Sequence, residues 1–496
     1  MNPTEHLAAL QVVVPFLAAP LIVLLKAKRL AWAATTLTSL LTFCIAIALT
    51  MGVLDGQNYQ YFMGSWPAPY GIELKVDAFS AVVLLIITGA STSALIAGYH
   101  SLDKQIGAKR QPMFFAAWIL ALAGLAGIVV SADAFNIFVF MEISSLASYV
   151  LVAGGPDRRA LPAVFKYLIF GTIGATFYLI GVGLIYMMTG TLNIEDMGVR
   201  IADVADQSPV LVAAGFITVG LALKAALFPL HIWLPNAYTF APHIVTVFLA
   251  ACATKVSLYV LFRFDFFVFQ ENLGGQQLHF TFFFLPLSVF AILIASAVAL
   301  FERNLKRLLA WSSVAQIGYI VLGASLVSIA GLTASVLHVF NHAIAKGSLF
   351  LAVACLACHI KRLRLTDIAG CAKAMPWTMG AMVLAGLSLI GVPGTAGFIS
   401  KWYLISAVLE LGGATGVFLT AVIVLGSLMA VIYVWRIVEY AYFKPQGKKP
   451  AVSEAPFGIL AITWIVAIGN LYFGINPELA VTLSESAASV LMGHNK

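Results

Sequence analysis

Long apolar segments, separated by short polar or turn-forming stretches, follow one another along the whole chain. Most are about as long as the roughly 20 residues that a helix needs to cross a bilayer, and they are too long for barrel strands, which alternate over about 10 residues. The segments are 7–25, 31–52, 76–99, 113–131, 134–153, 161–188, 209–230, 243–268, 279–301, 308–329, 333–360, 377–409, 414–443 and 455–475. We therefore predict an all-α polytopic membrane protein with about fourteen transmembrane helices.

Composition supports this class. Of the 496 residues, 61% are hydrophobic and 10% are charged, and the mean hydropathy is +0.98, whereas soluble domains carry about 25% charged residues. So little polar sequence lies between the spans that an aqueous catalytic domain is excluded. Residues 1–6 contain no basic cluster of the kind that begins a removable signal peptide. The first span is therefore expected to be permanent.

Lysine and arginine collect in alternate loops. Twenty of the 28 follow the first, third, fifth, ninth, eleventh and thirteenth spans, whereas the opposite loops hold Lys75, Arg200, Arg263 and Lys496. Because basic residues favour the cytoplasmic side, both termini are predicted to lie on the non-cytoplasmic side of a prokaryotic inner membrane. This bias accounts for the net charge of +7 without a nucleic-acid partner. The short loop 231–242 is the one expected cytoplasmic loop without lysine or arginine.

Two spans contain helix breakers. Pro229 interrupts the seventh span, and Gly391, Pro393, Gly394 and Gly397 interrupt the twelfth. Proline removes a backbone hydrogen bond, and broken helices five spans apart are typical of inverted repeats. We predict inverted five-helix repeats in spans 4–8 and 9–13. The expected units are an N-terminal three-helix segment (1–112), a first repeat (113–268), a second repeat (269–445) and a C-terminal helix with its tail (446–496).

Ionisable residues inside the spans are the first candidates for function. An ionised side chain at mid-bilayer costs about 3 kcal/mol or more, yet Lys224, Lys255, Lys346 and Lys401 all lie within apolar segments. Glu142 lies in the fifth span, among serines that indicate a hydrated face. Since a nearby carboxylate stabilises a buried ammonium, Glu142 approaching or leaving Lys224 is predicted to switch that lysine between holding and releasing a proton.

The eleventh span adds a second pattern. His338, His342 and Lys346 recur at every fourth residue, so they share one helix face. Because histidine titrates near neutral pH, this stripe is predicted to be a proton relay. Lys255 lies too deep to reach the membrane surface easily and is expected to face the bundle. Lys401 follows the break in the twelfth span and is expected to end the same axis.

The sequence shows no ligand set for a metal or a redox cofactor. Cys355 and Cys358 form a C-x-x-C pair, but their place in an apolar span favours packing as small apolar residues. The histidine stripe lacks the cysteine or carboxylate cluster of a metal site, and Ser400 stands where a phosphate-binding loop needs glycine before its lysine. Flavin, quinone, haem or iron–sulfur chemistry is therefore expected only in partner chains, and whether the chain is part of an enzyme stays open.

Several segments together carry a resemblance that covers nearly the whole chain. They are DAFNIFVFMEISSLASYVL, LKAALFPLHIWLPNA, ATKVSLYVL, FERNLKRLLAWSSVAQIGY, HVFNHAIAKGSLFL and GVPGTAGFISKW. With them the chain resembles the antiporter-like, proton-translocating membrane subunits of respiratory complex I, membrane-bound hydrogenases and Mrp-type sodium/proton antiporters. The resemblance implies proton movement along a hydrated central axis, in a complex with other membrane subunits.

By position, the resemblance assigns the family's ion pair to Glu142 and Lys224, and its relay lysine to Lys255. It assigns the histidines of the eleventh span to His338 and His342, and the terminal lysine to Lys401. Within the family, Lys401 and the short tail after residue 475 favour the Mrp-type D subunit. The alternative is a proton-pumping subunit of a complex I-like NADH-quinone oxidoreductase or of a membrane-bound hydrogenase.

Two other classes of function stay open on the sequence alone. A self-sufficient secondary transporter of a small solute would move its substrate as a single chain in liposomes. An inert membrane scaffold would tolerate removal of the buried charges. Neither needs a partner other than lipid, whereas the leading hypothesis requires further membrane subunits.

Overall fold

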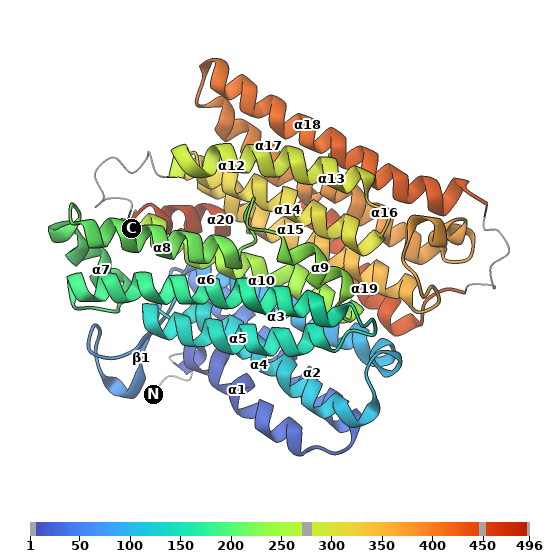
Figure 1. Ribbon diagram of the computed structural model, residues 1–496, viewed down its shortest axis with the longest axis horizontal. Helices are drawn as coiled ribbons and strands as arrows, with labels where there is room; N and C mark the ends of the chain where they lie inside the picture. Colours follow the sequence, from blue (N-terminus) through green and yellow to red (C-terminus); the bar gives the residue numbers. More distant parts are fainter. Residues whose placement is uncertain (1–5, 270–279, 446–452, 494–496) are drawn as a thin grey trace.

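The computed structural model describes residues 6–269, 280–445 and 453–493. Position 279, the expected start of the ninth span, and the ends of the expected C-terminal unit lie outside these residues. The helices run side by side along the long axis of the molecule, and the first described residues and the C-terminal helix lie at the same end (Figure 1). The predicted helical membrane protein is thus confirmed, with two short strands in addition.

Twelve of the described helical segments are long and apolar enough to cross a membrane. One of them, Phe282–Phe301, includes α12 (Leu285–Phe290) and α13 (Ser296–Phe301), joined by a π-helical turn. The others are α1 (Leu7–Leu24), α2 (Lys28–Leu54), α3 (Ala78–Ser101), α4 (Gln111–Val130), α5 (Ala134–Ala153), α6 (Ala160–Thr189), α10 (His243–Arg263), α14 (Leu305–Ala324), α15 (Ile329–Ala357), α18 (Gly413–Val438) and α19 (Phe457–Ile475). Each corresponds to one predicted span.

The seventh and twelfth spans are broken, as predicted. The first consists of α8 (Ser208–Lys224) and α9 (Trp233–Phe240), and the second of α16 (Pro376–Ile390) and α17 (Ala396–Leu409). With the twelve continuous segments they correspond to the fourteen predicted spans. The prediction of a loop at 231–242 was wrong, because most of these residues form α9. Only Ala241 and Pro242 separate α9 from α10, which explains why this connection carries no lysine or arginine.

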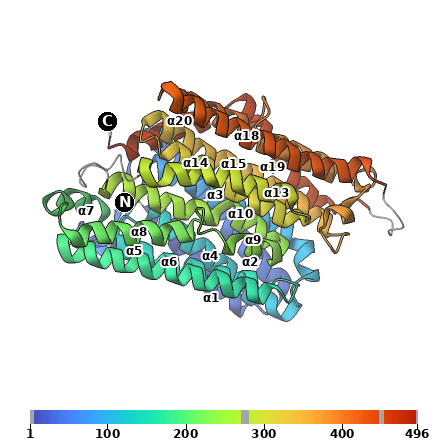
Figure 2. The ribbon, with the colours of Figure 1, turned by 45° about the horizontal axis from the view of Figure 1, so that its top comes forward.

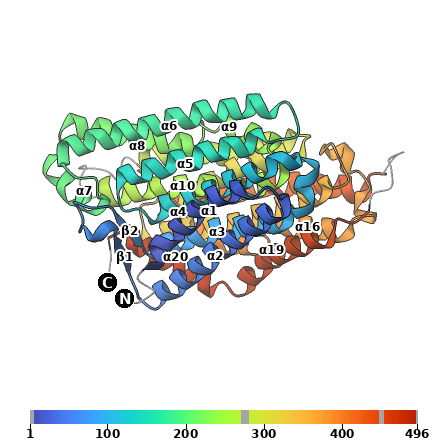
Figure 3. The same cartoon turned by 90° about the horizontal axis from the view of Figure 1, so that it is seen from below.

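Four short elements were not predicted. Strands β1 (Tyr59–Phe62) and β2 (Glu73–Val76) form an antiparallel pair after α2. Helix α7 (Ile194–Ile201) follows α6, and α20 (Glu478–Leu491) follows α19 and packs on α15 and α3. All lie at the end of the bundle that holds both termini (Figure 3). All four are shorter than the helices that could cross a membrane.

Helix α15 lies at the centre of the fold. It packs against α10, α14, α16, α17, α19 and α20, and α4, α10, α14 and α15 are almost wholly buried by other helices. Helices α1, α2, α6 and α18 lie outside this core (Figure 2), and expose leucine, isoleucine, valine and phenylalanine side chains. The buried helices α10 and α15 carry four of the seven candidate residues, and the outer helices present the apolar surface that lipid requires.

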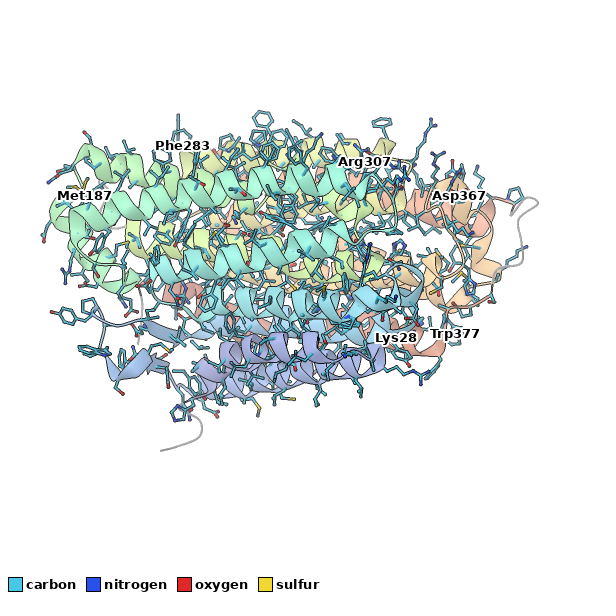
Figure 4. All side chains as sticks on the ribbon, turned by 60° about the horizontal axis from the view of Figure 1, so that its bottom comes forward. Lys28, Met187, Phe283, Arg307, Asp367 and Trp377 are labelled. Atoms are coloured by element: carbon cyan, nitrogen blue, oxygen red, sulfur yellow. The ribbon has the colours of Figure 1, made fainter. Side chains whose placement is uncertain are left out.

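The two ends of the bundle differ in charge. Lys28 and Arg307 lie at one end with Asp367 and Trp377, and Met187 lies at the other (Figure 4). This arrangement agrees with basic loops alternating along the chain. The predicted cytoplasmic orientation of the basic end stays a prediction.

Candidate functional site

A buried ion pair joins α5 to the broken seventh span. Asp133 caps α5 by accepting a hydrogen bond from the backbone N–H of Asn136, and Glu142 lies two turns further on. Lys224 is the last residue of α8, and its Nζ lies 3.4 Å from Oε1 of Glu142 and 2.7 Å from Oγ of Ser145. The side chain of Lys224 is 7% exposed and that of Glu142 is 29% exposed. The predicted pair is therefore formed, with one partner at the edge of the packed interior.

The break beside Lys224 is held by side chains from its second half. The indole Nε1–H of Trp233 in α9 donates to the carbonyl of Leu223 at 2.9 Å, so this carbonyl at the end of α8 has a partner, as membrane depth demands. A cavity of about 30 Å³ lies between Ser145, Lys224 and Ser257 of α10. Since a water needs roughly 10–15 Å³ of such volume, the cavity can hold one water between the pair and α10.

Lys255 lies in the middle of α10 and is 1% exposed. Its Nζ donates to the carbonyl of Ala250 on its own helix. It lies close enough to His342 and Lys346 of α15 to act on both electrostatically. Lys255 therefore faces the bundle, as predicted, between the first ion pair and the histidine stripe.

The histidine stripe of α15 forms as predicted. The rings of His338 and His342 are stacked, with centroids 6.1 Å apart and planes at 6°. His338 is hydrogen-bonded at Nδ1 to Ser400 and at Nε2 to Gln316, both at 2.9 Å. Neither ring nitrogen of His342 has a hydrogen-bond partner within the described residues. The two histidines thus share one face of α15, but only His338 has hydrogen-bond partners for its ring nitrogens among the described residues.

Lys346, one turn beyond His342, is completely buried. Its Nζ donates to the carbonyl of Leu309 at 2.7 Å and to Oγ of Ser312, both on α14. No carboxylate pairs with it among the residues that the structure describes. The ammonium is therefore held by neutral oxygens.

Lys401 of α17 reaches back to the other half of its broken span. Its Nζ donates to the carbonyls of Leu389 at 3.1 Å and Ile390 at 2.8 Å, at the C-terminal end of α16, and to Ser427 of α18 at 3.0 Å. Gly391 ends α16 with φ +92°, and a Cβ there would lie 2.9 Å from Cδ of Lys401. A glycine is needed at this turn both for its conformation and for the approach of the lysine.

The structure thus buries six of the seven predicted site residues and places the seventh, Glu142, against Lys224. What the sequence did not predict are the neutral partners, which come from other helices: Gln316, Ser312, Tyr319, Ser400 and Ser427. The aromatic ring of Tyr319, for instance, lies 4.9 Å from Nζ of Lys401. A polar residue within an apolar span could have marked these partners in the sequence. The spacing of residues along one helix does not indicate which helix packs against it.

Two basic residues expected in loops are buried instead. Arg263, expected in a non-cytoplasmic loop, ends α10 and forms a two-oxygen ion pair with Asp77, at 2.5 and 2.6 Å. Lys306, expected in a cytoplasmic loop, lies in the first turn of α14 and is 2% exposed. Arg263 lies inside the predicted run 243–268 and therefore belonged to the span, whereas α14 begins at Leu305, before its predicted start at 308, and so includes Lys306.

The two cysteines of the C-x-x-C pair lie near the end of α15. Sγ of Cys355 is buried and lies 3.3 Å from Oγ1 of Thr463. Within the described residues there is no group of three or more histidine, cysteine, aspartate or glutamate side chains that could hold a metal.

The long apolar helices, the two broken spans and the series of one glutamate, four lysines and two histidines define an antiporter-like membrane subunit. The chain belongs to the family described as NADH:quinone oxidoreductase/Mrp antiporter, TM, whose profile matches residues 131–428. It is 39% identical over 502 residues to NADH-quinone oxidoreductase subunit N of Desulforudis audaxviator, with 97% of each chain covered.

Two further relatives come from antiporter complexes. The chain is 27% identical to the D subunit of the Na(+)/H(+) antiporter of Bacillus subtilis, with 99% of this chain and 98% of the relative covered. The structure matches a chain of the Mrp complex from Dietzia sp. with a TM-score of 0.91 and 25% identity, over 99% of this chain and 98% of the other. The resemblance stated from the sequence is confirmed at the level of the family and the fold.

Proposed function

We propose that the chain moves protons across a membrane along the series Glu142, Lys224, Lys255, His342, His338 and Lys401, with Lys346 beside His342. The observation that carries this proposal is that buried ionisable groups lie on packed helices from α5 to α17. A serine and a water-sized cavity adjoin Lys224, His338 stacks on His342, and Ser400 joins His338 to the segment that carries Lys401. Buried charges are costly in a membrane and mark ion pathways. A scaffold would gain nothing from six buried basic side chains.

The ion pair supplies the switch in this proposal. While Glu142 lies beside Lys224, its negative charge stabilises the ammonium in a site of low dielectric. If Glu142 moves away, Lys224 keeps only Ser145 as a hydrogen-bond partner. Its ammonium then lacks a neighbouring negative charge, so transfer of its proton to the next basic group is favoured. A proton would then pass through the cavity toward Lys255 and the stripe of α15.

We further propose that the chain works in a respiratory complex of the complex I type. Its identity of 39% to the NADH-quinone oxidoreductase relative, against 27% to the antiporter relative of Bacillus subtilis, supports this alternative better than the Mrp-type assignment that the sequence motifs favoured. The Mrp-type antiporter is retained as the second candidate because the match to the Mrp structure extends over nearly the whole of both chains.

Purification of the intact complex through a tag on this chain tests the class. For the complex I type, membrane vesicles should take up or release protons when an electron donor and a quinone are supplied, and sodium should not be required. Proton movement driven by a sodium gradient without an electron donor would overturn the respiratory class and support the antiporter. Glu142→Gln should abolish either activity, and Glu410→Gln, at an exposed position, is the matched control.

We also propose that the two broken spans are equivalent parts of inverted repeats, covering spans 4–8 and 9–13. The support is that each break has a buried lysine beside it: Lys224 ends α8, and Lys401 of α17 donates to the carbonyls at the end of α16. Cysteine labelling from either side of the membrane tests the accompanying topology, in which both termini face the non-cytoplasmic side.

A further inference from the structure

A deep cavity opens at the basic end of the bundle, outside the candidate proton axis. Its volume is about 740 Å³, enough for a small organic anion or a lipid headgroup. It lies among the connections after α5, α13 and α15, with the short link between α9 and α10 as part of its wall. Arg307, which lines it, lies at this end of the molecule (Figure 4).

The lining of this cavity, which we term the basic pocket, has an excess of positive charge. Seven of its residues are lysine or arginine, and two are acidic. Both acids are already paired: Asp157 with Arg159 at 2.6 Å and Glu302 with Arg307 at 3.0 Å. The remaining five basic residues form no ion pair with a described carboxylate: Arg303, Lys306, Lys361, Arg362 and Arg364.

Lys306 distinguishes the basic pocket from an ordinary cluster of loop charges. Orientation in the membrane needs only exposed basic residues near the ends of spans, whereas Lys306 is 2% exposed. Its Nζ donates to the carbonyl of Ala241 at 2.7 Å, and an ammonium has three N–H donors. A buried cation with one neutral acceptor is suited to an incoming anion.

The surroundings of the basic pocket indicate where that anion comes from. Phe301, next to Glu302, is 81% exposed, and Leu161, two residues after Arg159, is 61% exposed. Both lie on helices of the outer, apolar surface, α13 and α6. The pocket therefore opens beside the region where acyl chains lie, at the depth of lipid headgroups.

We propose that the basic pocket binds the phosphate of an anionic phospholipid headgroup, with the acyl chains lying along α6 and α13. Basic pockets between transmembrane helices bind phosphate headgroups, and charge-assisted hydrogen bonds from arginine suit phosphate oxygens. The bound lipid joins the connection after α5 in the first half of the chain to those after α13 and α15 in the second half.

Native mass spectrometry of the full-length chain in a neutral detergent tests this proposal. Phosphatidylglycerol should stay bound where phosphatidylcholine does not. The triple substitution Arg303→Ala, Lys361→Ala and Arg362→Ala, all at exposed positions, should weaken phosphatidylglycerol binding at least about tenfold, because each basic side chain near an anionic lipid surface strengthens binding several-fold.

The matched control removes three exposed cations from other connections at the same end: Lys26→Ala, Lys109→Ala and Arg110→Ala. An equal loss in both triple variants would show a diffuse charge effect and overturn the basic pocket as a site. Equal retention of phosphatidylcholine would overturn recognition of the charge. Displacement of the lipid by millimolar inorganic phosphate would overturn the lipid as the source of the anion.

A second measurement uses the intact complex in vesicles. An amine-reactive, water-soluble reagent should label Lys361 less in phosphatidylglycerol than in phosphatidylcholine vesicles, relative to Lys109 at the same end. Equal protection in both lipids would mean that an acidic segment of another subunit fills the pocket, and would overturn the proposal.

Discussion

Nδ1 of His338 lies 2.9 Å from Oγ of Ser400, the residue immediately before Lys401. This hydrogen bond joins the first half of α15 to the second half of the broken twelfth span, so His338 and the terminal lysine are held in one arrangement. Together with the carbonyl contacts of Lys401, it makes the end of the axis the most completely hydrogen-bonded part of the site.

Ser400→Ala should therefore reduce proton transport by roughly fivefold, since a net hydrogen bond contributes about 1 kcal/mol. Proton movement by the assembled complex in vesicles is the measurement. Ser406→Ala, on the exposed side of the same helix, should have no effect. Wild-type transport by Ser400→Ala would show that the position of His338 does not depend on this bond.

Glu142→Gln and Lys224→Met should each abolish transport. Each should also destabilise the protein by roughly 2 kcal/mol, because removing one partner leaves a buried charge uncompensated. The double variant should recover most of the thermal stability but none of the transport. If either single variant keeps more than half of the wild-type transport, the pair is not the switch.

Substitutions of the two histidines should both abolish transport but should differ in their effect on stability. His338→Leu leaves Gln316 and Ser400 without their partner and should cost about 2 kcal/mol. His342→Leu removes two unpartnered nitrogens and should be neutral or stabilising, while both variants lose transport. Thermal unfolding in detergent and proton movement in vesicles measure the two effects. Equal destabilisation by both substitutions would contradict the difference in their hydrogen bonding.

Lys401→Arg should block turnover although it keeps the charge, because arginine stays protonated under all physiological conditions. Lys166→Arg, at an exposed position of α6, should leave transport unchanged. Near-normal transport by Lys401→Arg would mean that Lys401 provides only a fixed charge, and proton release would have to involve another group.

Arg263→Leu should destabilise the protein by about 3–5 kcal/mol, since it leaves the buried carboxylate of Asp77 without its partner. Transport per folded molecule should stay at the wild-type level, because Arg263 and Asp77 contact α3 and α10 and not the axis. Replacing both with leucine should recover part of the stability. A loss of transport in the stable double variant would place this pair in the proton path.

The sequence predicted most of the fold because each crossing needs its own apolar run, and lysine in such a run is too costly to be incidental. It therefore identified all four site lysines. It could not predict that residues 233–240 form a helix, because the predicted run ends at residue 230 and the second half of the break is stabilised by tertiary contacts such as that of Trp233. Nor could it pair Lys401 with Ser427, since the facing of helices depends on the whole bundle.

The two broken spans differ in what stabilises their lysines. Lys224 pairs with the carboxylate of Glu142, which a substitution can remove or restore. Lys401 donates to the backbone carbonyls of Leu389 and Ile390. No amino-acid substitution removes a backbone carbonyl. A genetic selection for restored folding should accordingly find second-site suppressors of Lys224 variants at position 142, whereas Lys401 variants should have none at positions 389 or 390, because a substitution there leaves the backbone carbonyl in place.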